Sequence, residues 1–579
     1  MKQLTDQLFS RIKRLESWQV ACILAIVGFA VFFTGLATPF QNDDTFQIVN
    51  NPPVHSISHL SQFFQSGTYW DGQKLTGDYY RPMMTTVFSI IYSVAGAYPV
   101  AFHIFQLTLY IASAFLLYLV FKRFLKPVIA LSLSLVFLVH PLNSQIVYSI
   151  ATMQDVLFFF FGILAIWLLI RDESDKSLWA VSSSLLFSMF SKEAGFVFVI
   201  VSLLYLLWFN KQRVRVFLST LALPTIFYLI LRIHAVGLFH KQLVAPIDNA
   251  SFVGRLFNVP SIVEFYFSKL IFPWKLSTTH YWVYSKFSVD HFLIPLIVDA
   301  AVIGLFVYLG FRVRSKLSKK QFKPYLFFSV WTVLGILPYL QIVPLDMTVS
   351  ETWFYFSIAG LLGMIGTALP TLKVRFKPQL LLIPAMLLIG VFGIRTAVRG
   401  IDYRSQIVLA QHDIKESSGD YTAMMSVSQY DIDHGNYKEA IIYAQNSIDT
   451  YPVTANYNLL GVALEQSGDY QGAVNAYSRA LKYGNLNVVY ENLGLILIVY
   501  SDPATTSQLF QKAINAYPND FKIWLYLAIF EGANGANDKA KIAINNAAKY
   551  GTVPAAIYNN IFSDQPFSLP LLGKNIVVK

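Results

Sequence analysis

Residues 150–170 read IATMQDVLFFFFGILAIWLLI, a stretch that is apolar from Val156 to its end and has one charged residue, Asp155, near its start. A helix of roughly 20 apolar residues spans the hydrocarbon core of a bilayer. The stretch therefore predicts a membrane-spanning helix. Similar apolar runs recur on both sides of it as far as Arg395, whereas the chain from Asp402 onward has the mixed composition of a soluble protein.

The composition of the whole chain agrees with a membrane protein. Of its 579 residues, 55% are hydrophobic and 13% are charged, against about 25% charged residues in soluble proteins. The net charge of +11 comes from Lys and Arg residues that lie in short groups between apolar runs. Cytoplasmic loops of membrane proteins are rich in such residues, so we expect no nucleic-acid partner. The single cysteine, Cys22, lies in the first apolar run and excludes a disulfide framework.

Eleven apolar runs are predicted to span the membrane. They are 18–37, 100–121, 127–141, 150–170, 177–190, 194–209, 213–231, 291–311, 324–343, 353–370 and 378–395. With the N-terminus in the cytoplasm, basic groups such as Lys122 and Arg123 fall on the cytoplasmic side. Two shorter stretches, 83–95 and 259–274, are expected to form interfacial or re-entrant helices on the outer face.

This threading places the long loops on the outer side. They are 38–99, 232–290, the short loop 344–352 and everything after Arg395. We therefore expect an all-α protein with a multispanning membrane domain over residues 1–400, whose outer loop 38–99 carries an acidic motif, and an extracytoplasmic domain over residues 401–579. Long loops on one face of a membrane enzyme commonly carry its catalytic residues.

From Tyr421 the chain repeats itself at a period of 33 to 34 residues, the length of the tetratricopeptide repeat. Small and aromatic positions recur in register, for example Gly461 and Tyr477 in one unit and Gly494 and Phe510 in the next. About four repeats are predicted, forming an α-solenoid. Because such arrays commonly hold a peptide or partner protein, we expect this domain to recruit an acceptor or a partner.

Short motifs recur at the outer ends of the predicted spans. The first loop contains Asp43-Asp44, then Asn51-Pro52, then Tyr80-Arg81-Pro82. Further along the chain the motifs are Phe102-His103, His140-Pro141, Asp155, Ser191-Lys192-Glu193 and Glu351 with Tyr355. In this order they resemble the transmembrane and tetratricopeptide-repeat-containing O-mannosyltransferases, a family of multispanning GT-C type glycosyltransferases, and we expect a prokaryotic relative in a cell membrane.

The resemblance implies a sugar donor carried on a polyprenyl phosphate in the membrane lipid. It implies transfer of a hexose such as mannose to hydroxyl groups of an exported protein. Two motifs depart from the family pattern: Met153-Gln154 replaces Gly-Arg, and Thr352-Trp353 replaces Arg-Tyr. These departures concern the identity of the donor more than the class of reaction.

The residue types suit that chemistry. A hydroxyl is a poor nucleophile until a base takes its proton, and Asp44 or Asp43, with Asp44 preferred, is the candidate base. The leaving lipid phosphate needs cations, for which Arg81 and Lys192 are candidates. The set of candidates for binding the donor phosphate or substrate is Arg81, Lys192, Glu193, His103, His140, Asp155 and Glu351.

Other roles stay open for several of these residues. Lys192 and Glu193 also fit a local ion pair, and the two histidines also fit hydrogen-bonded interface residues. Asp155 and Glu351 are alternatively ligands of a divalent cation such as Mg²⁺ or Mn²⁺. Two further functions remain. The first is a polysaccharide polymerase or ligase, which places key residues in a large late outer loop, whereas loop 344–352 of this chain is short. The second is a non-catalytic scaffold, which has no need for carboxylates at several outer helix ends.

Overall fold

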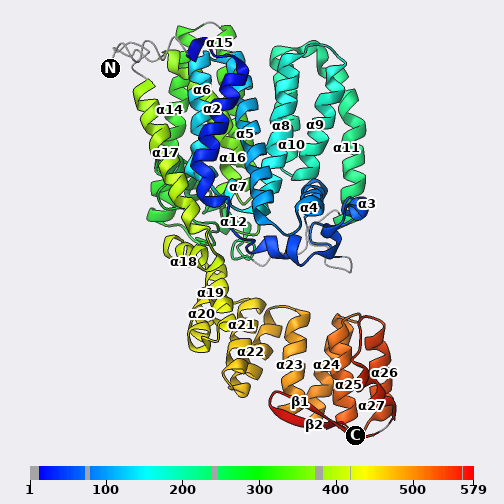
Figure 1. Ribbon diagram of the computed structural model, residues 1–579. Helices are drawn as coiled ribbons and strands as arrows, with labels where there is room; N and C mark the ends of the chain where they lie inside the picture. Colours follow the sequence, from blue (N-terminus) through cyan, green and yellow to red (C-terminus); the bar gives the residue numbers. More distant parts are fainter. Residues whose placement is uncertain are drawn as a thin grey trace. The chain divides into compact units, whose positions relative to one another are not determined.

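The computed structural model describes residues 12–71, 79–237, 245–317, 319–371, 382–417, 419–563 and 565–578. The chain divides into two compact units, 1–418 and 419–579 (Figure 1). The division falls later than the expected boundary at 400 because helix α18 (Gln406–Glu416) joins the membrane unit. Asp413 of α18 accepts hydrogen bonds from Thr278, and Ser417 Oγ lies 3.1 Å from His280 Nδ1, so α18 is bonded to the 272–290 loop.

The membrane unit is a bundle of helices joined by short helical turns. Its α-helices are α2 (Ser17–Phe32), α3 (Leu60–Phe63), α4 (Pro82–Ala95), α5 (Pro99–Phe124), α6 (Pro127–Val139), α7 (Gln145–Tyr148), α8 (Met153–Arg171), α9 (Ser177–Ser191), α10 (Gly195–Phe209), α11 (Val214–Val236), α12 (Phe252–Leu256), α13 (Val259–Ile271), α14 (Ile294–Lys316), α15 (Lys319–Ile336), α16 (Tyr355–Ala368), α17 (Leu382–Asp402) and α18. Turns used below are η2 (Thr45–Val49), η8 (Val289–Leu293) and η10 (Glu351–Phe354).

Each of the eleven expected spans coincides with a helix, although residues 378–381 lie outside the described part. Within that part, seven helices are long and apolar enough to cross a membrane, or eight if α6 and α7, bent by 51°, form one span. The expected spans 177–190 and 194–209 are α9 and α10, each of 15 residues. Such helices are about 22 Å long, which is shorter than the hydrocarbon core.

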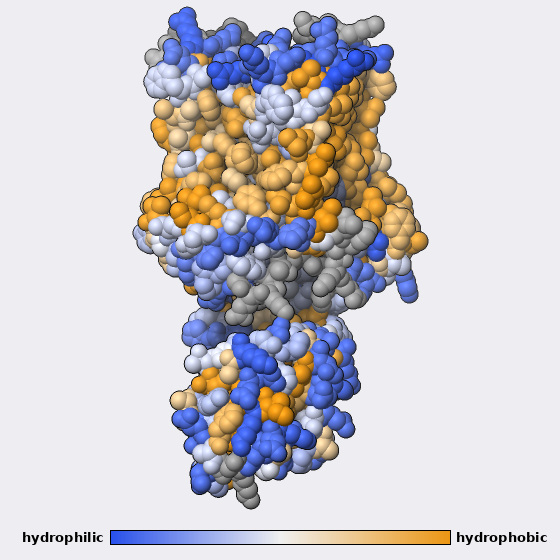
Figure 2. Space-filling view, turned by 90° about the vertical axis from the view of Figure 1, so that its right-hand side faces the viewer, coloured by the Kyte–Doolittle hydropathy of each residue, from blue (hydrophilic) through white to orange (hydrophobic). Residues whose placement is uncertain are grey.

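The surface of the bundle confirms a multi-pass membrane protein. Figure 2 shows a hydrophobic belt on the membrane unit between two hydrophilic rims. Helices α11 and α14 contribute large exposed apolar side chains to the surface, among them Leu223, Ile230 and Ile297. In water such a belt would be costly, and in a bilayer it faces lipid tails.

Inside the bundle, small residues allow close helix packing. A Cβ atom added at Gly363 of α16 would lie 2.4 Å from the ring of Phe328 on α15, so only glycine permits this approach. The indole of buried Trp331 on α15 donates a hydrogen bond to the carbonyl of Phe356 on α16. Helices α8, α9, α10 and α11 lie side by side in the bundle (Figure 1). Packing through small residues and interhelical hydrogen bonds is typical of membrane proteins.

The stretches expected as interfacial helices form α4 and α13. They have 14 and 13 residues, too few to cross the bilayer. Figure 1 shows α3 and α4 together at one end of the bundle. This end also receives the first loop, which carries Asp43 and Asp44.

The second unit is the predicted tetratricopeptide solenoid. Its described residues form four helical hairpins, then a single helix and a β-hairpin: α19 (Tyr421–Asp433), α20 (Tyr437–Thr450), α21 (Thr454–Gln466), α22 (Tyr470–Tyr483), α23 (Asn487–Tyr500), α24 (Pro503–Ala516), α25 (Phe521–Ala533), α26 (Asn537–Ala548), α27 (Ala555–Ser563), β1 (Phe567–Leu571) and β2 (Lys574–Val578). The strands are antiparallel, and Phe567 pairs with Val578. The array of helical repeats expected from Tyr421 onward is therefore confirmed.

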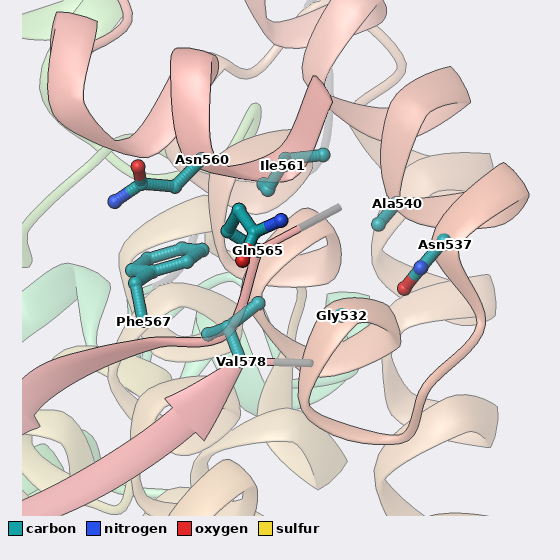
Figure 3. Close-up of a pocket in the computed structure, with 8 residues that line it drawn as sticks. All are labelled: Gly532, Asn537, Ala540, Asn560, Ile561, Gln565, Phe567 and Val578. Atoms are coloured by element: carbon teal, nitrogen blue, oxygen red, sulfur yellow. The ribbon is translucent and has the colours of Figure 1, made fainter. Parts of the chain in front are cut away.

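The β-hairpin closes the last repeat. Val578 is buried against α25, where a Cβ added at Gly532 would lie 2.4 Å from its side chain. Figure 3 shows a small pocket beside this contact, with Asn537 on one side and Asn560 and Phe567 on the other. The hairpin thus covers apolar surface of α25.

The close contact between α21 and α22 predicts a sensitive position in the array. A Cβ at Gly461 would lie 2.4 Å from the ring of Tyr477, which is fully buried. Gly461→Ala should lower the local free energy of unfolding by about 1–3 kcal/mol, because the ring must shift. In an exposed helix the same change would stabilise by up to about 1 kcal/mol. Hydrogen–deuterium exchange over α21 and α22 in the full chain measures the effect.

Gln466→Ala, on the exposed side of α21, is the matched control. Its exchange protection should stay within about 0.5 kcal/mol of the wild type. Equal protection in the two variants would contradict the packing described for Gly461.

Candidate active site

The acidic pair lies in a tight turn just after the first membrane helix. Asn42 has a φ of 48°, a left-handed conformation that asparagine tolerates. The next residues, Asp43 and Asp44, point into different surroundings: Asp43 is exposed, whereas Asp44 is 3% exposed. The Asp44 carboxylate accepts a hydrogen bond from the backbone N–H of Gln41 at 3.1 Å, immediately before turn η2. Asp44 therefore organises the loop, and Asp43 lies at the surface of the protein.

A second bond ties this loop to the end of the last membrane helix. The side-chain amide of Gln41, which is buried, donates to the backbone carbonyl of Tyr403. Thr34 Oγ1 donates to the carbonyl of Ala397 at 2.9 Å. The turn that carries the two aspartates is therefore fixed to a rigid element, which is what a precise catalytic geometry needs.

The two carboxyl groups differ in their electrostatics. Burial raises the pKa of Asp44 from 3.8 to about 7, and the hydrogen bond from Gln41 only partly offsets this. The pKa of Asp43 is also raised, because surrounding protein atoms desolvate its carboxylate despite its accessible surface. The hydrogen bond from Tyr69 Oη at 3.1 Å and the charge of Arg81 oppose that rise. A carboxylate with a raised pKa is a better proton acceptor.

Arg81 stands at the start of α4 and is held by Glu193. Pro82 occupies the first turn of α4, so the helix begins directly after Arg81. Glu193 Oε2 lies 3.6 Å from Arg81 Nε, and its other oxygen accepts from the backbone N–H of Tyr80 at 3.2 Å. Arg81 Nε is buried and has no hydrogen-bond partner within the described residues. Its contact with Glu193 at 3.6 Å is therefore an ion pair without a hydrogen bond.

Lys192 and Asp155 form a buried ion pair. Lys192 follows the end of α9 and Asp155 lies in the first turn of α8; they are 8% and 2% exposed. The Lys192 ammonium donates to Asp155 Oδ1 at 2.6 Å. The charge of Arg81 acts on Lys192, so the two cations belong to one electrostatic neighbourhood. The ion pair that the sequence left as an alternative forms with Asp155 and not with the adjacent Glu193.

Three residues of this neighbourhood were missed by the sequence analysis as site candidates. Tyr69 bonds Asp43, while Tyr79 Oη donates to Asp346 Oδ2 at 2.7 Å. The ring of Tyr79 lies 4.2 Å from the Arg81 guanidinium carbon, a cation–π distance. Asp346 belongs to no motif, and the only signal in the sequence is its place in the loop 344–352, which also contains Glu351.

Glu351 lies in a second polar cluster. It is fully buried at the start of η10 and accepts a hydrogen bond from the backbone N–H of Ser277 at 2.7 Å. Its charge is coupled to that of Arg399 on α17, which is also fully buried. Arg399 Nη1 donates to Asp402 at 3.2 Å, and Asp413 lies 3.8 Å from its Nη2. These bonds connect α17, α18 and the outer loops.

The two histidine candidates have backbone partners. His103 Nε2 lies 3.1 Å from the carbonyl oxygen of Thr38. His140 Nδ1 accepts from the backbone N–H of Leu142 at 3.2 Å, and its Nε2 lies 3.0 Å from the carbonyl of Leu270. Both side chains are buried. The bonds of His140 occupy both ring nitrogens, so its geometry is that of an interface residue.

The carboxylates do not gather into a cation site. Within the described part of the chain, no three His, Cys, Asp or Glu side chains are placed to hold one metal ion. Asp155 is bonded to Lys192, and Glu351 to Ser277. The described residues thus form no ready-made cluster for the divalent cation that the sequence left open. What they do bring together is an exposed carboxylate and two cations at one end of the bundle.

Comparisons with known proteins give two similar sequences and no matching family model. The chain is 25% identical to Protein O-mannosyl-transferase F38B6.6 of Caenorhabditis elegans over 190 residues, which are 31% of this chain and 27% of that protein. It is 23% identical to Protein O-mannosyl-transferase TMTC3 of Homo sapiens over 142 residues, 24% of this chain and 15% of that protein. The matches thus span far less than two thirds of either relative.

Among solved structures, the crystal structure of ArnT from Cupriavidus metallidurans in the apo state is similar at 13% identity. The match covers 88% of this chain and 79% of that chain, with a TM-score of 0.38. The relatives found by sequence bear the same name as the family that the motifs resemble. The predicted resemblance of this chain to the protein O-mannosyl-transferases is therefore confirmed over the matched part of its length.

Proposed function

We propose that this protein is a membrane glycosyltransferase that moves a hexose such as mannose from a polyprenyl-phosphate carrier to a hydroxyl group of an exported protein. The observation that carries the proposal is the neighbourhood of Asp43, Arg81 and Lys192 at the end of the bundle that holds α4. The similarity to O-mannosyl-transferases supports the same class of reaction.

In this reaction the acceptor oxygen attacks the anomeric carbon of the sugar. The bond between that carbon and the phosphate oxygen breaks, its electron pair leaves with the lipid phosphate, and a glycosidic bond forms. The acceptor proton goes to a base. We assign this role to Asp43, because it is exposed, whereas Asp44 is buried and bonded to Gln41. Asp44, the preferred base from sequence alone, is in this proposal a positioning residue.

Arg81 and Lys192 neutralise the departing phosphate. Glu193 and Asp155 orient these cations, so the geometry exists before the donor arrives. A guanidinium group presents several N–H donors, which suit the oxygens of a phosphate. Arg81 directly precedes the interfacial helix α4, a suitable place for a phosphate whose lipid tail lies in the bilayer.

The repeat unit recruits the acceptor or a partner protein. Helical repeat arrays offer extended concave surfaces on which peptides bind. With the N-terminus in the cytoplasm of a prokaryote, loop 38–99 and the repeats face the outside of the cell membrane, where exported proteins arrive. A tag after residue 578 that is labelled only in broken cells would contradict this orientation.

The first prediction concerns the base. Asp43→Asn should lower transfer from a purified polyprenyl-phosphate hexose by about 10²- to 10⁴-fold, because the acceptor hydroxyl loses its proton acceptor. Asp44→Asn keeps an oxygen that accepts the Gln41 N–H, so its loss should be smaller by at least about tenfold. Mass spectrometry of the modified acceptor gives the rates.

Asp290→Asn, in the exposed turn η8, is the matched control and should transfer at the wild-type rate. Full activity of Asp43→Asn would eliminate Asp43 as the base. A larger loss in Asp44→Asn would return that role to Asp44.

The second prediction concerns pH. The base must be ionised, and desolvation by the surrounding protein raises the pKa of Asp43 above 3.8. The rate of transfer should therefore fall as the pH drops, along a limb whose midpoint lies above 3.8. Initial rates between pH 3 and 8 measure this limb; a limb at or below 3.8 would contradict the described surroundings of Asp43.

The third prediction separates stability from catalysis at the ion pair. Lys192→Met leaves the Asp155 carboxylate buried and unpaired, which should cost about 3–5 kcal/mol of folding free energy. The double variant Lys192→Met/Asp155→Leu replaces the pair by apolar side chains and should recover most of that loss. It should nevertheless remain inactive, because the phosphate loses a cation. Thermal unfolding in detergent and the transfer assay measure both; recovery of activity would exclude Lys192 from the donor site.

A further inference from the structure

We propose that Asp346 is a positioning residue for this transfer, which orients Arg81 through Tyr79 and sets the charge around Asp43. The inference rests on the proposed function. Asp346 is no part of the acidic pair, of the Lys192 ion pair or of the motifs on which the family resemblance depends. Its role follows from where the late outer loop places it.

The contact between the first and the late outer loops is direct. Tyr79 Oη donates to Asp346 Oδ2 at 2.7 Å across 267 residues of sequence. The same tyrosine ring lies 4.2 Å from the guanidinium carbon of Arg81. The aromatic ring is thus held by Asp346 at its hydroxyl end and supports the Arg81 cation on its face. Without Asp346 the hydroxyl end of Tyr79 loses this bond, and the ring is held less firmly against Arg81, which Glu193 also contacts at 3.6 Å.

The late loop is built to hold Asp346 in place. Gln341 is fully buried and has a φ of 59°. Its side-chain amide donates to the carbonyls of Met347 and Thr348 at 2.8 and 2.9 Å, and its oxygen accepts from the N–H of Leu345 at 3.0 Å. One side chain therefore fixes the backbone on both sides of Asp346.

Thr348 extends the bracing to the loop 272–290. Its Oγ1 donates to the carbonyl of Trp282 at 2.7 Å, and its N–H donates to the carbonyl of His280 at 2.9 Å. His280 in turn pairs with Val349 as an isolated β-bridge. Asp346 thus projects from a fixed platform toward Tyr79, and not from a mobile tip.

The charge of Asp346 also reaches the proposed base. The charged and titratable groups that act on Asp43 are Tyr69, Arg81, Asp346 and the neighbouring Asp44. Of these, Arg81 lowers the pKa of Asp43, and Asp346 raises it. When the negative charge of Asp346 is removed, the positive charge of Arg81 lowers the pKa of Asp43 without this opposing contribution. Asp43 then ionises at lower pH and is a weaker proton acceptor.

Two variants separate the positional role of Asp346 from its charge. Asp346→Asn removes the charge, whereas Tyr79→Phe removes only the hydrogen bond. Tyr79→Phe should slow transfer from a polyprenyl-phosphate hexose by roughly 10²-fold, because Arg81 is misplaced. Asp346→Asn keeps an amide oxygen that accepts from Tyr79, so its rate should fall less, but its acid limb should move to lower pH because a negative charge near Asp43 is gone. In Tyr79→Phe the limb should not move to lower pH. Asp290→Asn should leave both the rate and the limb unchanged.

The results separate this inference from the function on which it rests. A wild-type protein that transfers no hexose from the lipid donor overturns the proposed function. A wild-type protein that does transfer, together with an Asp346→Asn variant whose acid limb does not move, overturns the inference alone. Should Asp346→Asn fail to fold, Tyr79→Phe decides: wild-type rates would overturn the positional role, and a loss near 10²-fold with an unmoved limb would support it.

Discussion

A buried ion pair between Lys192 and Asp155 holds together the elements around the proposed donor site. Burying a charged group costs free energy, and the attraction between these two groups at 2.6 Å offsets part of that cost. The pair joins the start of α8 to the junction between α9 and α10, the junction from which Glu193 reaches Arg81. The cations of the site are therefore fixed by the bundle before any phosphate arrives.

The loop that carries the acidic pair depends on a second anchor. Gln41 bonds both Asp44 and the carbonyl of Tyr403, so the first outer loop is attached to the end of the last membrane helix. The buried Arg399 cluster holds that helix end to α18. Two charge clusters thus serve the proposed site. In the proposed mechanism the cluster of Arg81 and Lys192 contacts the donor, and the cluster of Arg399 holds the helices and loops in place.

The sequence predicted the helices well because hydrophobic length is a local property. Each expected span coincides with a helix, and the repeats fold as their period indicates. The shortness of α9 and α10 could be read from the sequence, but the way they pack could not. The assignment within the acidic pair was harder, because Asp43 and Asp44 are chemically identical and only the turn at Asn42 determines which is buried.

Contacts between distant segments were beyond the sequence. Glu351 has the residue type and the outer position of a site residue, yet its partners are Ser277 and Arg399. Asp346 belongs to no recognisable motif. Its hydrogen bond with Tyr79 depends on how loops 38–99 and 344–352 meet in space. Sequence patterns indicated the end of the bundle that holds the proposed site, and tertiary packing determines which residues meet there.

The central claim is that a lipid phosphate is held between Arg81 and Lys192. A polyprenyl phosphate with a photoreactive group next to its phosphate tests this claim directly in the purified protein. Peptide mapping after irradiation should find the label in the segments around Arg81 and around Lys192, and excess unlabelled polyprenyl phosphate should compete it away. Labelling confined to other segments, or labelling that the competitor leaves unchanged, would contradict the account.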